Sequence, residues 1–307
     1  MDRQKKIEEA QKHLQGGALD GWLLYDFHRN NELAYRFLEI PTHRMATRRF
    51  FYWIPARGEP LQIVHAIEEG MLDDWPGEKR VYATWQSLEK ELKRLLSPVK
   101  KIAMEYSPKN AIPYVSKVDA GTVDLIRSFG VEVASSAEFL LYFTAVLSES
   151  QIQSQQRAAK ACCEIMQDAW HWIANCLSQD RITTEQEVQA RILKQFEERR
   201  LLSDALPIVA VGPHSADPHF STPQIDSRPI RKGDLVLIDL WAKEKGEGNV
   251  FGDITRVAVA DTQASVQQLE VFHAVRRAQT AAFDLIRFHF QFGMDVYSLE
   301  IELPQKL

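Results

Sequence analysis

The hydrophobic pattern changes period near residue 148, and no other feature constrains the fold as much. Before this point, short apolar runs typical of strands alternate with helical spacings, as in residues 21–26 and 84–96. After it comes one long amphipathic helix, with Ile152, Ala159, Cys163, Met166, Trp170 and Ile173 at intervals of three, four or seven. A chain of 307 residues can also bury two cores. We therefore expect two domains, residues 1–147 and residues 148–307.

The first domain is predicted to be α/β. Its pattern indicates helices over residues 2–15, 84–96 and 113–129, and strands over residues 21–26, 48–54, 61–65, 101–105 and 131–133. Helices that alternate with strands at short range indicate a sheet covered by helices. We expect a mixed sheet here.

The second domain is predicted to be α+β. Helices are expected over residues 148–177, 184–200 and 264–287, and strands over residues 206–211, 235–241 and 253–260. Thr184 and Glu187 form a capping box that starts the second helix, in which Glu187 reaches back to the Thr184 amide. The connection from Ala242 to Gly252 contains Gly246, Gly248 and Asn249, which suit a turn between neighbouring antiparallel strands.

Composition excludes several classes of partner. The net charge is −5, so no global positive field holds nucleic acid or an anionic membrane. No apolar run approaches the ~20 residues of a membrane span, and the charged N-terminus lacks the apolar core of a signal peptide. The cysteines, Cys162, Cys163 and Cys176, fit no zinc spacing and indicate reduced packing residues. We expect a cytoplasmic protein that binds small or peptide ligands.

Asp239 is the first residue that a simple apolar strand does not explain. Alternation along LVLIDLW places it on one face with Leu235, Leu237 and Trp241. An ionised carboxylate buried there without a partner costs several kcal/mol, so Asp239 is exposed, protonated, paired with a cation or bound to metal. For one isolated aspartate, a position at the wet end of a strand is the simpler interpretation.

Asp253, on the neighbouring strand, favours a cation site at Asp239 over that simpler interpretation. A hairpin that joins the two strands places Asp253 opposite Asp239, and two like charges on adjacent strands destabilise each other unless a cation lies between them. Carboxylate ligands suit Mn²⁺, Mg²⁺ or Fe²⁺, and bridging carboxylates support a two-metal hydrolytic site. Arg256 is a competing salt-bridge partner, although alternation directs it to the opposite face.

Two histidines precede the first of these strands in VGPHSADPHF. For His214, a solvated or turn-stabilising role is expected. His219 stands directly before Phe220, and its imidazole is placed to enter a pocket, where it passes protons or holds a substrate oxygen. The spacing alone does not decide between that role and a solvated one.

Three segments taken together resemble the pita-bread metallopeptidases: VAVGPHSADPHF, KGDLVLIDLWA and FGDITRVAV, in this order after two helices. That family includes Xaa-Pro aminopeptidase, prolidase and methionine aminopeptidase. The resemblance covers roughly residues 148–287, and residues 1–147 resemble the creatinase-type domain that precedes the catalytic domain in prolidase and aminopeptidase P. Methionine aminopeptidase lacks such a domain, so the resemblance favours the proline-directed branch.

The resemblance implies a function and a site. Asp239 and Asp253 would bridge two divalent metal ions, with Mn as the first choice and Co, Zn or Fe as alternatives. His219 would be the catalytic residue that contacts the substrate near the scissile bond, and a water activated by the metals would attack the carbonyl. The substrates would be proline-containing peptides, cleaved before proline.

The sequence departs from the family pattern after Asp253. The family site also needs a later His and two later Glu, and the candidates are Glu270, His273, His289, Glu300 and Glu302, none of them in a family-like context. For Glu270 and His273 a solvated helix face is expected. We therefore expect the first half only of the pita-bread domain, truncated at its C-terminal end, with at most weak metal binding and no peptidase activity in this chain.

Two alternatives stay open at this point. One is a non-catalytic binding or dimerisation protein that kept the first half of the fold, which the missing ligands favour. The other is a creatinase-like hydrolase that uses no metal, against which the retention of both aspartates argues. An incomplete sheet would leave Leu235, Leu237, Val257 and Val259 facing water, so we expect a homodimer or another self-associated form.

Overall fold

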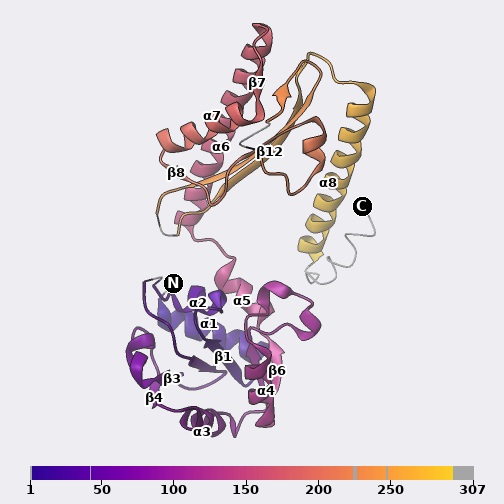
Figure 1. Cartoon of the computed structure of the whole chain (residues 1–307). Helices are drawn as coiled ribbons and strands as arrows, with labels where there is room; N and C mark the ends of the chain where they lie inside the picture. Colours follow the sequence, from indigo (N-terminus) through magenta and orange to yellow (C-terminus); the bar gives the residue numbers. More distant parts are fainter. Residues whose placement is uncertain (1, 42, 224–226, 247, 293–307) are drawn as a thin grey trace. The chain divides into compact units, whose positions relative to one another are not determined.

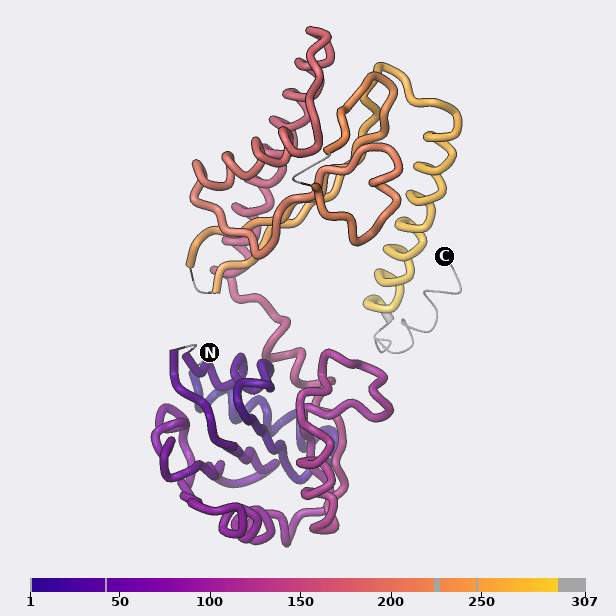
Figure 2. The backbone as a smooth tube through the Cα atoms, viewed as in Figure 1, coloured from indigo at the N-terminus to yellow at the C-terminus, as the bar shows by residue number. Residues whose placement is uncertain are grey.

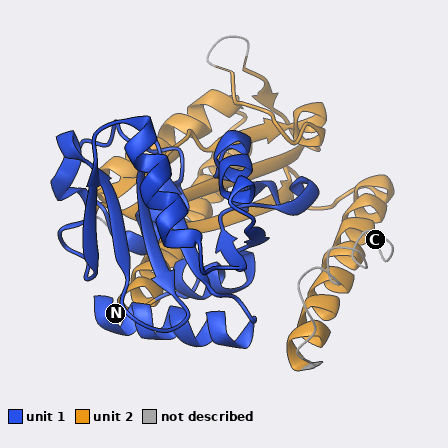
Figure 3. Ribbon diagram, turned by 90° about the horizontal axis from the view of Figure 1, so that it is seen from below, with its two compact units in different colours: residues 1–147 blue, residues 148–307 orange. Residues whose placement is uncertain are grey.

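The structure is a computed structural model that describes residues 2–41, 43–223, 227–246 and 248–292. It divides into two compact units, Met1–Leu147 (unit 1) and Ser148–Leu307 (unit 2), coloured separately in Figure 3. That the N-terminal domain, residues 1 to about 145, folds without the rest of the chain stays a prediction. Within the described ranges no helix has the length and apolar character needed to cross a membrane.

Unit 1 contains a six-stranded mixed sheet (Figure 1). The strand order is β4-β3-β2-β1-β5-β6, with β1 Gly21–Asp26, β2 Phe50–Pro55, β3 Leu61–His65, β4 Glu78–Tyr82, β5 Lys101–Met104 and β6 Glu132–Ser135. β2 is antiparallel to both of its neighbours, and the other adjacent strands pair in parallel. All strands except β2 therefore run in one direction, so their carboxyl ends share one edge of the sheet.

Helices cover both faces of this sheet. One face packs against α1 Arg3–Gly16, α2 Glu32–Leu38, α5 Ala137–Thr144 and the 3-10 segment η1 Ala66–Leu72. The opposite core lies under α3 Trp85–Leu96 and α4 Ala120–Ser128. The helix predicted over residues 113–129 is wrong in its first part. There the chain forms the short 3-10 segment η3 Pro113–Val115, which follows another, η2 Pro108–Asn110. α4 begins only where the Asp119 carboxylate accepts a hydrogen bond from the Thr122 amide at 2.8 Å.

A fully buried carboxyl group lies inside unit 1. Glu105 follows β5 and accepts hydrogen bonds from Trp22 Nε1 at 2.6 Å, Asn31 Nδ2 at 2.7 Å and Ser136 Oγ at 3.1 Å. Burial disfavours the charged form and raises the pKa of Glu105 from 4.5 to about 7, although the three donors oppose that shift. Glu105 thus joins β5 to β1, α2 and the start of α5.

This raised pKa predicts a pH dependence of stability. Because the folded state holds the proton more tightly than the unfolded state, the contribution of Glu105 is complete below pH 4.5 and is lost as the pH rises to about 7. The loss amounts to about 3 kcal/mol. Urea unfolding of the chain at pH 5 and pH 8 measures it, and the Glu105→Gln variant should show a smaller difference between the two pH values. An equal difference in both proteins would contradict the assignment.

Unit 2 is built on two helices and a long hairpin. α6 Glu149–Ser178 and α7 Glu185–Glu198 pack against the core-facing side of β11 Leu235–Glu244 and β12 Gly252–Val259. β9 Ile208–Val211 and β8 Leu201–Leu202 also pair with β11, and β7 Thr183–Thr184 pairs with β10 Pro229–Ile230. Figure 2 shows the hairpin crossing α6. α8 Val266–Phe292 follows β12.

The buried face of α6 agrees with the predicted one at Met166 and Ile173, but Ala158, Cys162 and Ala169 are buried in place of Ala159, Cys163 and Trp170. Its buried residues are Ser154, Ala158, Cys162, Ile165, Met166, Ala169, Ile173 and Cys176. Of the cysteines expected to pack, Cys162 and Cys176 are buried, whereas Cys163 is exposed. Small residues recur along this face, so the strands approach the helix closely. The spacing of apolar side chains alone did not predict this close approach.

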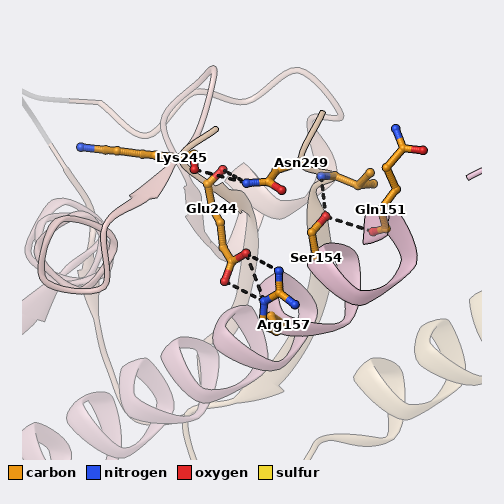
Figure 4. A network of polar contacts seen from close by, with 7 residues as sticks. Gln151, Ser154, Arg157, Glu244, Lys245 and Asn249 are labelled. Carbon is orange, nitrogen blue, oxygen red and sulfur yellow. Dashed lines mark hydrogen bonds and ion pairs between the residues drawn. The ribbon is translucent and has the colours of Figure 1, made fainter. Parts of the chain in front are cut away.

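A polar network attaches the end of the hairpin to the start of α6 (Figure 4). Arg157 makes a bidentate ion pair with Glu244, with its Nη2 at 2.8 Å from Oε2. Ser154 Oγ accepts a hydrogen bond from the Val250 amide at 3.1 Å, and Asn249 Nδ2 donates to the Glu244 carbonyl at 3.3 Å. The Arg157 guanidinium lowers the pKa of Glu244. These contacts fix the turn between β11 and β12.

Candidate metal centre

Asp239 and Asp253 lie on the same face of the hairpin, but not directly opposite each other. In the antiparallel register Asp239 pairs with Thr255, and Trp241 pairs with Asp253. The prediction that Asp253 stands opposite Asp239 is therefore wrong by two residues. Because the shift is an even number, both carboxylates still share one face, where diagonal neighbours interact through their side chains.

This face is partly open to solvent. Val236, Ile238 and Leu240 on the other face are buried in the core of unit 2, whereas Asp239 is half-buried and Asp253 is exposed. Thr255 Oγ1 donates a hydrogen bond to Asp239 Oδ1 at 2.6 Å and so fixes that carboxylate. Of the possibilities that the sequence left for Asp239, an exposed carboxylate therefore agrees better with the structure than a charge buried in a core.

The two carboxylates influence each other electrostatically. Partial burial raises the pKa of Asp253, and the negative charge of Asp239 raises it further. A cation between them would remove this repulsion, and the all-oxygen donor set fits a hard divalent ion. Within the described ranges no group of three or more His, Cys, Asp or Glu side chains is placed to hold a metal. The residues present therefore fit one cation with few protein ligands.

Trp241 and Arg256 are the next candidates for contact with the two carboxylates, and they lie on opposite faces of the hairpin. Trp241 Nε1 donates a hydrogen bond to Asp204 Oδ1 at 2.6 Å, which orients the indole beside Asp253. Arg256 pairs with Ile238 in the register and donates from Nη1 to the Thr255 carbonyl at 3.0 Å. Alternation therefore places Arg256 on the face away from the two carboxylates, as expected.

His219 lies in the loop that leaves β9. The loop begins with the 3-10 segment η4 Gly212–Ala216 and returns to β9 at Thr222, whose Oγ1 accepts a hydrogen bond from the Val209 amide at 2.8 Å. His219 is exposed, and its amide donates to Asp217 Oδ1 at 2.9 Å. The loop is thus closed onto the strand beside β11, and the imidazole faces solvent.

Glu185 is the residue that the sequence interpretation missed. It is fully buried at the start of α7 and accepts hydrogen bonds from the Val211 amide at 2.8 Å and the Arg228 amide at 3.0 Å. Its Oε1 also lies 2.7 Å from His214 Nδ1. Of the two roles expected for His214, the solvated one is therefore wrong: its ring contacts Glu185 and stacks on Phe220, with 4.4 Å between the ring centroids. An acidic residue in the first helical turn was the only signal in the sequence.

The predicted capping box is only half formed. Thr184 Oγ1 accepts from the Glu187 amide at 3.2 Å, as expected, but the Glu187 carboxylate accepts from Thr183 Oγ1 at 2.9 Å instead of from the Thr184 amide. The Thr184 residue belongs to β7, which pairs with β10. This pairing draws residues 227–230 to the start of α7, where Arg228 reaches Glu185.

The later candidate ligands do not join the two aspartates. Glu270 and His273 are exposed on α8, as expected for a solvated face, and His289 is buried near the end of that helix. Glu300 and Glu302 lie outside the described residues. Among the described residues, the site brought together by the structure is therefore Asp239 with Asp253, supported by Thr255.

Comparison with known proteins shows a family to which part of the chain is similar. Residues 153–299 match metallopeptidase family M24. Over 110 residues the chain is 33% identical to the probable dipeptidase PepE of Mycobacterium tuberculosis, and this match covers 34% of the chain and 26% of that protein. The chain thus aligns with about a quarter of the length of its curated M24 relatives.

Solved structures of M24 enzymes share the fold. Dipeptidase PepE from Mycobacterium ulcerans matches with a TM-score of 0.61 and 19% identity, over 91% of this chain and 70% of that one. An X-prolyl aminopeptidase from Caenorhabditis elegans, described as a cytosolic enzyme with a di-nuclear active site, matches with a TM-score of 0.55 and 15% identity, over 87% and 42%. The expected fold, an α/β unit followed by a pita-bread unit, is confirmed.

Proposed function

We propose that the M24 domain binds a divalent metal ion through Asp239 and Asp253. The observation that carries this proposal is the placement of two carboxylates on one sheet face, where partial burial and the charge of Asp239 raise the pKa of Asp253. Two like charges held together on a rigid hairpin are stabilised by a cation. Mn²⁺ is the first choice for such oxygen ligands, with Co, Zn or Fe as alternatives.

The chemistry of this site is hydrolysis of a peptide bond. A bound divalent ion would polarise the scissile carbonyl and lower the pKa of a water molecule. Thr255 holds Asp239 in a fixed rotamer through its hydroxyl hydrogen bond, so the ligand is oriented before any ion arrives. His219, on the loop beside β11, is proposed to contact the substrate and to supply or accept a proton, which requires the exposed ring to turn towards the hairpin.

The substrates are proposed to be peptides with proline after the scissile bond. This proposal rests on the dipeptidase and X-prolyl aminopeptidase relatives and on a unit 1 that accompanies the M24 domain, as in those structures. A cytoplasmic location, proposed on the same grounds, agrees with the cytosolic relative. Both aspartates argue against a hydrolase of this fold that uses no metal.

The 307-residue chain itself is predicted not to hydrolyse Xaa-Pro peptides. Two carboxylates leave most coordination positions to water, and a second ion has no further ligands among the described residues. Incubation of the chain with an Xaa-Pro dipeptide and Mn²⁺, followed by chromatography of released proline, tests this. Metal-dependent release of proline that is lost in Asp239→Asn would show that the site is complete.

A second candidate function is binding or dimerisation without catalysis. Val257 is 40% exposed on the same face as Asp239, beside the half-buried Leu237 and Val259. α8 also exposes large apolar side chains, among them Val266, Val271, Phe272, Val275, Phe283 and Phe290. Apolar surface of this extent favours association, so we propose a homodimer or another self-associated form. Metal content separates the two functions, because this one needs no ion.

A further inference from the structure

A pocket of about 560 Å³ opens in unit 1, at the edge where the parallel strands end. Phe27 follows β1, His65 ends β3 and Tyr82 ends β4, and all three line it. The amino end of the antiparallel β2 adds Arg48 and Arg49 from the residues just before it. The pocket therefore belongs wholly to unit 1 and is distinct from the carboxylates of the M24 domain.

The topology of the sheet favours a ligand at this place. β1 and β5 are parallel neighbours, yet the helix after β1, α2, packs in one core and the helix after β5, α4, packs in the other. In open α/β sheets such a divergence forms a crevice at the carboxyl ends of the strands, where ligands bind. A second pocket of about 210 Å³ lies there and shares Tyr25, Phe27 and Asp119 with the first.

Two guanidinium groups give the larger pocket a positive character. Arg49 is half-buried, its carbonyl accepts a hydrogen bond from Tyr82 Oη at 2.7 Å, and its side chain also interacts with the Tyr82 hydroxyl. Arg48 is exposed beside it. The one carboxylate of the lining, Asp119, already accepts from Thr122 Oγ1 at 2.8 Å and from Tyr25 Oη at 3.0 Å.

Neutral donors add to these charges. His65 Nδ1 accepts a hydrogen bond from the Ile67 amide at 3.1 Å, so the neutral ring carries its proton on Nε2. α3 and α4 both begin at the pocket, with caps Thr84 and Asp119. First-turn amides of a helix lack intrahelical partners and attract anions. At α4 the Asp119 carboxylate already accepts from the Thr122 amide, so the start of α3 is the helix end that can attract an anion here.

Aromatic surface flanks the same pocket. Trp85, the first residue of α3, is 63% exposed, and Phe27 is 41% exposed. Both are unusually open for large apolar side chains, and both belong to the lining. An aromatic face of this kind stacks on a planar ring.

We propose that this pocket binds a phosphate monoester that carries a planar ring. The two guanidiniums, His65 Nε2 and the start of α3 suit the phosphate, and Trp85 with Phe27 suits the ring. A nucleoside monophosphate and a phosphorylated pyridine coenzyme share this chemistry. The proposal is independent of the metal site and of peptidase activity.

Calorimetric titration of the whole chain with AMP and with pyridoxine 5′-phosphate tests this assignment. We expect at least one of them to bind with one site per chain and a Kd below ~1 mM, a free energy of about −4 kcal/mol. Adenosine carries a planar ring without phosphate, and inorganic phosphate carries no ring, so each should bind at least tenfold more weakly. Tighter binding of AMP would indicate a nucleoside monophosphate as the ligand, and tighter binding of pyridoxine 5′-phosphate would indicate a phosphorylated pyridine coenzyme.

Three variants locate the binding. Arg49→Gln should weaken binding at least tenfold, and Trp85→Ala, at an exposed position, should weaken the ring-bearing ligand but not inorganic phosphate. Arg57→Gln makes the same charge change at the opposite edge of the sheet and should leave binding unchanged. The proposal is overturned if neither ester binds with a Kd below ~5 mM, a free energy of about −3 kcal/mol. It is also overturned if Arg49→Gln binds the ester as tightly as the original chain does, or if Arg57→Gln loses as much affinity as Arg49→Gln.

Discussion

Glu185→Ala is expected to lower the free energy of unfolding of unit 2 by about 3–5 kcal/mol. The substitution removes a hydrogen-bond acceptor of two amides, those of Val211 and Arg228, and the partner of the His214 ring. Each buried donor left without an acceptor costs about 1–3 kcal/mol. Because Val211 leads directly into the loop that carries His219, that loop should also become mobile.

Urea unfolding of the full chain, with hydrogen exchange at the amides of β9, measures this effect. Glu187→Gln is the matched control, since Glu187 is exposed on the same helix two residues further on. Its stability should change by less than about 1 kcal/mol. A small effect of Glu185→Ala would mean that the buried hydrogen bonds contribute little to unit 2.

Gly252→Ala is expected to destabilise unit 2 by about 3 kcal/mol and to displace Asp253. A Cβ atom at Gly252 would lie 2.3 Å from the Ala159 amide nitrogen and 2.6 Å from the Ala158 carbonyl carbon, both backbone atoms of α6. Neither atom can move without moving the helix. The Gly252 carbonyl also accepts a hydrogen bond from Cys162 Sγ at 3.5 Å, so β12 would separate from α6 at the residue that precedes the second carboxylate.

Thermal unfolding and metal binding measure the two parts of this prediction. Gly16→Ala serves as a control, because a Cβ atom at Gly16 meets no other atom within 4 Å. It should leave both stability and metal affinity nearly unchanged. If Gly252→Ala behaved like this control, the close packing of β12 on α6 would be absent in solution.

The long helices and strands, and their order along the chain, could be predicted from apolar periodicity. The short elements could not be predicted in this way. The strands of the hairpin and the helices α3, α6, α7 and α8 follow long, regular patterns. α2, β4 and α5 were not predicted. β4, whose sequence is EKRVY, exposes most of its side chains at the edge of the sheet and lacks an apolar signature. α2 is only seven residues long, which leaves little periodicity to recognise.

The site was predictable in its residues and not in its geometry. Alternation assigned Asp239 and Asp253 to one face, because that depends only on even spacing along each strand. The register depends on the length of β11, which extends to Glu244 and takes the turn further from Asp239 than the sequence interpretation assumed. Glu185 was missed because its partners come from segments 26 and 43 residues away in the sequence.

Calorimetric titration of the 307-residue chain with Mn²⁺ tests most directly the central claim that Asp239 and Asp253 together bind a divalent metal ion. We predict weak binding, with a Kd of ~10⁻⁴ to 10⁻³ M, that is lost in both Asp239→Asn and Asp253→Asn but kept in Asp261→Asn, an exposed aspartate just after β12. Affinity should fall as the pH is lowered, because the raised pKa of Asp253 makes it take up a proton first. Binding that is the same in all four proteins would contradict a metal site between Asp239 and Asp253.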